Sequence, residues 1–251
     1  MKRSICVNIL VGLTLTSGLA LSACSREGAA QGPAAPQATS EWTATPAIAA
    51  VTRTARGLQV SGVTEPQGRV VLRSTDDRAY GTGSDQNGRF SLAMPAPAGD
   101  ALFSIEGQRG ELTGLAPQVL LVAADPAGPA VLLAEGAPSR RLDVAGPLDT
   151  IDSDGRAVIA SGRAAAGTQV EIGVEGRAPF PALTGADGRW SALLSSSGAG
   201  AMSVTVGGRR YDYPGPGDAA QPLLAPSGAG WRATRRLGEA SWQSAWFPAA
   251  G

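Results

Sequence analysis

Two short stretches, Asn87-Gly-Arg-Phe-Ser91 and Asp187-Gly-Arg-Trp-Ser191, decide how this chain folds. They lie at the same offset as several other matching pairs, which shows that a longer unit is repeated. These pairs are Leu58–Gly62 with Val158–Gly162, Val70–Leu72 with Val170–Ile172, and, one residue further apart, Phe103–Ile105 with Val204–Val206. A repeat of about 100 residues has the size of a typical domain. We therefore expect two copies of one domain.

Apolar residues alternate with polar or small ones inside each copy. In the second copy, Val170, Ile172 and Val174 are separated by Glu171 and Gly173. This period of two indicates strands with one buried face, and turn residues interrupt it about every eight to twelve residues, as in a small sandwich. The two Asx-Gly pairs supply the positive φ angles that tight hairpins need. We expect an all-β fold of two tandem sandwiches, over residues 47–145 and 146–251.

Each copy is followed by a tail that the repeat does not explain. The first tail holds two apolar runs, Val119–Ala123 and Val131–Ala134. The second ends in Gly230–Arg236 and Ser241–Phe247, which we interpret as a closing hairpin around 237–239. We expect both tails to complete their sandwiches.

The repeated pattern resembles bacterial Ig-like domains and is similar to the carboxypeptidase regulatory-like domain. It covers residues 57–107 and 156–208, which is less than half of the chain. The resemblance implies a seven-stranded sandwich and says little about function, because such folds carry many functions. The antibody-type branch is excluded, because its paired Cys residues are absent.

The N-terminus has the pattern of an export signal. Lys2 and Arg3 precede an apolar run from Ile5 to Leu21, which fits a secretory signal better than a membrane span. The run ends in Leu21-Ser-Ala-Cys24, which resembles the lipobox of bacterial lipoproteins. The resemblance implies a diacylglyceryl thioether on Cys24, cleavage after residue 23 and acylation of the new N-terminus. The alternative is an ordinary signal peptide followed by an accidental Cys.

Residues 24–46 are rich in Ala, Pro, Gly, Ser and Thr, and we expect a disordered tether there. Cys6 leaves with the signal, so a lipidated Cys24 leaves no thiol for a disulfide. Acyl chains would anchor the protein without a membrane span. Ser25 resembles the outer-membrane sorting default of enterobacterial lipoproteins. We expect a lipid-anchored protein of the cell envelope, in the outer membrane and facing the periplasm.

Composition excludes several classes of function. The 21 Lys plus Arg residues balance 21 Asp plus Glu, so the chain lacks the basic excess of a nucleic-acid binder. It has no His, and its one Lys is Lys2, inside the signal. Ser-His-Asp, Cys-His and Ser-Lys chemistry and His-based zinc sites are therefore excluded in the mature chain. We expect no enzymatic activity and no cofactor apart from the covalent lipid.

The closing hairpin gathers aromatic side chains. Strand alternation places Trp242 and Trp246 on one face, with Phe247 on the other. Trp231 and Arg232 lie on the neighbouring strand, where a guanidinium could cover a ring. Such a Trp/Arg platform could bind sugar rings or a partner's apolar patch. The candidate binding residues are Trp231, Arg232, Trp242 and Trp246. The alternative is that the rings fill the core, or face lipid.

Asp152-Ser-Asp154-Gly155 resembles the start of a calcium loop, but a strand follows at once and the distant Glu is missing. An Asx turn explains it better, and we expect no metal site. Two functions remain. The first is a non-catalytic interaction or scaffold lipoprotein that offers its edge strands to another envelope protein. The second is a glycan- or peptidoglycan-binding lipoprotein that uses the Trp/Arg hairpin.

Overall fold

The computed structural model describes residues 44–143, 146–196, 200–239 and 241–249. All regular elements in these ranges are β-strands and every strand pair is antiparallel, which confirms the all-β prediction. In the described ranges no helix is long and apolar enough to cross a membrane. The predicted signal, Cys24 and the tether up to residue 43 lie outside the described residues.

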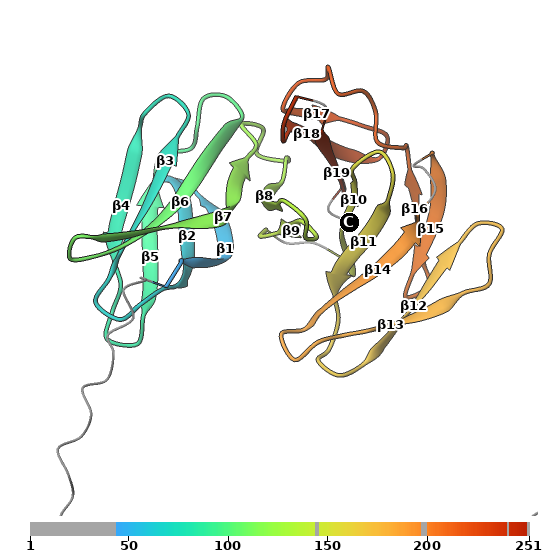
Figure 1. Ribbon diagram of the computed structural model, residues 1–251, viewed down its shortest axis with the longest axis horizontal. Coiled ribbons are helices and arrows are strands. Elements are labelled where there is room, and N and C mark those ends of the chain that lie inside the picture. Colours follow the sequence, from blue (N-terminus) through green and yellow to red (C-terminus); the bar gives the residue numbers. More distant parts are fainter. Residues whose placement is uncertain (1–43, 144–145, 197–199, 240, 250–251) are drawn as a thin grey trace, which may run out of the picture. The chain divides into compact units, whose positions relative to one another are not determined.

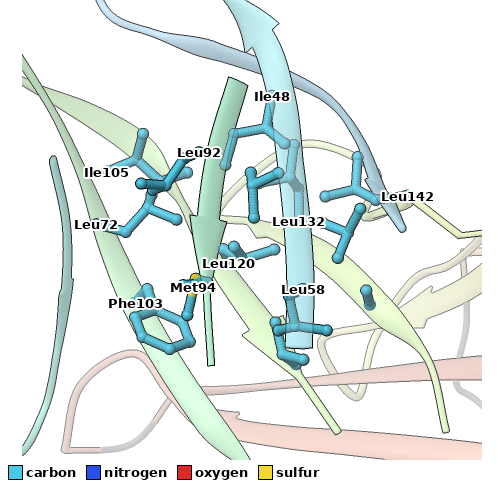
Figure 2. Packing of buried hydrophobic residues seen from close by; sticks show 14 of the residues in the cluster. Ile48, Leu58, Leu72, Leu92, Met94, Phe103, Ile105, Leu120, Leu132 and Leu142 are labelled. Atoms are coloured by element: carbon cyan, nitrogen blue, oxygen red, sulfur yellow. The ribbon is translucent and has the colours of Figure 1, made fainter. Parts of the chain in front are cut away.

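The first copy forms two facing sheets (Figure 1). One has three strands in the order β1 (Ala47–Thr54), β2 (Gly57–Val63), β5 (Arg89–Met94). The other has six, in the order β4 (Ala79–Gly83), β3 (Arg69–Ser74), β6 (Ala101–Arg109), β7 (Leu112–Val122), β8 (Ala130–Ala134), β9 (Arg140–Arg141). Alternate residues of both sheets meet in one apolar core, shown in Figure 2, that includes Leu58, Leu72, Phe103 and Leu120.

The second copy repeats this arrangement. Its six-stranded sheet has the order β14 (Arg189–Ser195), β11 (Val158–Arg163), β10 (Leu148–Ser153), β19 (Trp242–Pro248), β18 (Gly230–Arg236), β17 (Leu224–Pro226). Its four-stranded sheet has the order β13 (Phe180–Leu183), β12 (Gln169–Val174), β15 (Met202–Val206), β16 (Arg209–Tyr213). A second core lies between them and includes Ile172, Trp190, Val204 and Trp246.

Strand order follows the sequence repeat. The sequence β1-β2-β5 in one sheet corresponds to β10-β11-β14, and β4-β3-β6-β7 corresponds to β13-β12-β15-β16. The Asx-Gly turns also match, because Gly88 and Gly188 both have a φ of 74°. Residues 40–251 form one compact unit. The division into two domains at residue 145 therefore stays a prediction.

The two tails pack against each other as well as extending their sheets. Leu121, Val131 and Leu133 from β7 and β8 meet Ala245 and Phe247 of β19 in a third apolar cluster, which we call the junction cluster. Residues next to them in sequence, such as Leu120 and Leu132, face the first core instead. These strands are buried on both faces, which is why the apolar runs of the tail do not alternate. The tails thus have a role that the sequence prediction missed.

Candidate functional site

Trp246 is a core residue. It is only 1% exposed, its ring lies edge-on to Tyr213 with centroids 6.0 Å apart, and its Nε1–H donates to the Ser227 carbonyl at 2.9 Å. A buried ring whose polar atom already has a partner offers nothing to a ligand. The sequence left a binding platform and core packing open, and for Trp246 the structure shows core packing. Phe247 lies on the opposite face as predicted, in the junction cluster.

Arg232 is buried too, at 6% exposure. Register pairs it with Trp246 across the hairpin, and its guanidinium donates to the Gly215 carbonyl at 2.8 Å and to Gln221 Oε1 at 3.1 Å. Burial lowers its pKa below the ordinary value, but a guanidinium remains charged at neutral pH. In the part of the chain that the structure describes, the cation–π contact joins Arg209 to Tyr211 and involves no Trp. The stacking of Arg232 on a Trp ring, which the sequence left possible, is therefore not found among the described residues.

The other two predicted residues are half-buried and lie apart. Trp231 packs against the junction cluster. Trp242 lines an open hollow of about 610 Å³, which we call the Trp242 hollow, together with Asp154, Arg156 and Ile159. Of the four residues predicted to form one binding surface, Trp242 is the one whose side chain lines this hollow.

A buried carboxylate lies at the edge of the Trp242 hollow. Asp152, 7% exposed, accepts hydrogen bonds from Ser139 N at 2.8 Å and Ser139 Oγ at 2.6 Å, and more weakly from Gln243 and Thr150 at 3.4 Å. Gln243 also donates to the Ala134 carbonyl at 2.9 Å. Burial raises the pKa of Asp152 to about 6 against the opposing effect of these bonds. The group ties the segment after β8 to β10 and β19.

This shift predicts a pH-dependent stability. The folded state holds the Asp152 proton up to a pH of about 6 and the unfolded chain up to 3.8. Between these values the folded state binds more protons, so the free energy of unfolding falls as pH rises, by roughly 3 kcal/mol in all. Denaturant titrations of the wild type and of Asp152→Asn between pH 4 and 7 measure this effect. The free energy of unfolding of the wild type minus that of the variant should fall as pH rises.

Asp154→Asn is the matched control. Backbone hydrogen bonds lower the pKa of Asp154, so its contribution to stability is lost as pH falls. A wild type minus Asp152→Asn difference that is flat with pH would show that Asp152 ionises freely in the fold.

Asp154 belongs to a turn. Its Oδ1 accepts from Arg156 N at 2.8 Å and Ala157 N at 2.7 Å, which is the Asx geometry expected from the sequence. Across the described ranges, no group of three or more His, Cys, Asp or Glu side chains is placed to share a metal ion.

A second hollow is lined in part by the Pro138–Arg140 segment. It has a volume of about 410 Å³, we call it the Arg140 hollow, and it is lined by residues of β11, β13, β14 and the turn between β13 and β14. Arg163 and Arg189 stand beside it and share the buried carboxylate of Asp149, at 2.9 and 3.2 Å. Sequence reasoning missed this cluster, because its basic residues come from three separate stretches and form no motif.

No family model matches the chain, and no curated protein matches it.

Proposed function

We propose that the protein is an envelope lipoprotein, anchored by lipid on Cys24, that acts as a non-catalytic interaction module. Its docking surface is the open edge of β14, and its partner is an extended segment of another envelope protein. Under this proposal the lipid holds the protein at the outer membrane, facing the periplasm, and residues 24–46 are the tether. The lack of His anywhere, and of Lys beyond the signal, supports a role without catalysis.

The observation that carries the proposal is the state of β14. It is the terminal strand of the six-stranded sheet and pairs with β11 along one side. The Leu194 carbonyl already accepts from the Arg177 guanidinium and the Arg189 carbonyl from Gly185 N, so the stretch left for a docking segment lies between them. Leu193 on this strand is 52% exposed and the neighbouring Ser191 is exposed as well. A terminal strand of seven residues without Pro is a template for strand addition.

Three of the other terminal strands are less suited to docking for reasons of sequence or length. β13 contains Pro181, β17 ends in Pro226, and β9 has two residues. Pro blunts an edge because it lacks the N–H that a ladder needs. β14 is longer than these three strands, and it carries an exposed leucine. β1 is longer still, with eight residues, but its Val51 N–H already donates to the Leu142 carbonyl.

Contacts between the two copies support the six-stranded sheet to which β14 belongs. The junction cluster has the character of a protein interior, and Asp152 and Gln243 add hydrogen bonds to the segment after β8. Rigid support lowers the conformational entropy lost on binding. The arrangement suits a scaffold that holds an edge strand in place.

The test is a photo-crosslinking residue at Leu193 in the full-length protein in intact cells. We expect a discrete protein adduct from Leu193 and none from the control position Leu115, which is 63% exposed on β7. Failure to obtain an adduct from Leu193, in a protein that still fractionates with the membrane, would overturn the proposal. In the same cells, Cys24→Ser should release the protein from the membrane.

A second candidate function is glycan binding, and the observation that favours it is the half-buried Trp242 beside Asp154 and Arg156. Sugar rings stack on a Trp face and bind charged groups at its rim. The burial of Trp246 and Arg232 removes the rest of the predicted platform. A crosslinking residue at Trp242 separates the two functions, because glycan-modified peptide from that position would favour the second.

A further inference from the structure

In the described part of the chain, no carboxylate forms an ion pair with Arg140, the cation of the Arg140 hollow. Its Nε is buried without a hydrogen-bond partner within the described residues. Burial is the main cause that lowers its pKa and the Arg189 cation lowers it further, while the Asp187 and Asp149 carboxylates raise it. A guanidinium still keeps its charge at neutral pH. Arg140 is therefore a charge that the fold partly desolvates and does not pair.

The two carboxylates that attract Arg140, Asp149 and Asp187, accept hydrogen bonds from other groups. Asp149, 1% exposed, is shared by Arg163 and Arg189. Asp187 Oδ1 accepts from Arg189 N at 3.1 Å within its own turn. Three guanidinium groups thus face two carboxylates, and the surplus positive charge lies at Arg140.

A desolvated, unpaired guanidinium lowers stability unless an anion binds it. Its planar set of donors matches the two oxygens of a carboxylate, and such charge-assisted hydrogen bonds are among the strongest in proteins. The hollow also includes Ser191 of β14 and the 69%-exposed Leu183 of β13. An acidic side chain and an apolar neighbour from one extended segment would meet matching surfaces there.

We propose that the Arg140 hollow binds a carboxylate side chain of the segment that docks along β14. This inference rests on the proposed function, since the hollow is lined by the same strand, and it specifies the partner: an extended segment that carries Asp or Glu. Arg140 donates to the carboxylate, and Leu183 contacts an apolar residue beside it.

The binding test uses the purified lipidated protein in detergent. Blocked glutamate, blocked glutamine and inorganic phosphate are titrated in turn while the Arg140 Nε–H resonance is followed by NMR. We expect a saturable shift with blocked glutamate, none with blocked glutamine, and about tenfold weaker binding to Arg140→Gln, followed at the Ser191 amide. Arg140→Lys, which keeps the charge and loses the fork, should bind with intermediate strength. A response to phosphate alone, or to none of the three, would overturn the carboxylate assignment.

A second readout separates a ligand-binding arginine from a structural one. Since Arg140 is unpaired, Arg140→Gln should unfold at a temperature equal to or above that of the wild type. Arg78→Gln, which removes an exposed ion pair with Asp76, is the control. A clear loss of thermal stability in Arg140→Gln would show that Arg140 supports the fold, against the proposal.

The crosslink at Leu193 distinguishes the two proposals. Under both, Arg140→Gln reduces the yield of the adduct and Arg78→Gln leaves it unchanged. An undiminished adduct in Arg140→Gln would refute the carboxylate and leave docking at β14 intact. A missing adduct in the otherwise wild-type protein would refute the docking, and the titration would still decide whether the hollow binds a carboxylate.

Discussion

Trp246→Ala is expected to lower the free energy of unfolding by about 3–5 kcal/mol, as large-to-small changes of buried aromatic residues do. The ring is 1% exposed, packs edge-on against Tyr213 and donates to the Ser227 carbonyl. Its removal leaves a cavity in the second core and a carbonyl without its donor. Urea denaturation monitored by circular dichroism would measure the loss.

Trp242→Ala is the matched control, because it changes the same residue type on the same face of β19. Its side chain is half-buried at the edge of a hollow, so solvent can fill the space that it leaves. We expect a loss of less than about 2 kcal/mol, since less apolar surface leaves the interior. Equal losses for the two variants would contradict the placement of Trp246 in the core and Trp242 at its edge.

This pair also shows what strand alternation can and cannot predict. Alternation fixed which residues share a face, and the structure agrees that Phe247 lies opposite Trp246. It carries no information on depth along the strand. Trp246 lies opposite Ile151, in the middle of the core. Trp242 lies four residues earlier, at the first position of β19, where the strand reaches the end of the sheet. Position along the sandwich therefore decided which Trp reached a surface.

The fold was predictable because its signals are local. The Asx-Gly turns and the period of two act within a few residues, and the repeat supplied each of them twice. The junction was harder to predict. The apolar runs of the tails were interpreted only as strands that complete each sandwich, and nothing in the sequence shows that the second face of β8 meets β19. The Arg140 hollow could not be predicted either, because it is formed by residues of β9 and β14, which are distant in sequence.

Arg141→Met is expected to lower the free energy of unfolding by about 3–5 kcal/mol, the range for breaking a buried ion pair on one side. The Arg141 side chain is 2% exposed and bonds Asp143 with two nitrogens, at 2.6 and 3.1 Å. Its third nitrogen donates to the Pro248 carbonyl at the end of β19. Methionine has a similar length and keeps much of the packing, so the loss reports the polar contacts. Chemical denaturation at neutral pH measures it.

A double-mutant cycle with Asp143→Asn separates the ion pair from the remaining contacts of Arg141. Both single variants break the same ion pair, so the sum of their losses counts it twice, and the double variant should be more stable than that sum predicts. The part of the free energy of unfolding that the double variant does not recover is assigned to the Pro248 carbonyl, because Met has no hydrogen-bond donor for it. Strict additivity of the two losses would show that Arg141 and Asp143 act independently. The stabilising role of Arg141 would then rest on its bond to β19, which joins the end of the first copy to the last strand of the second.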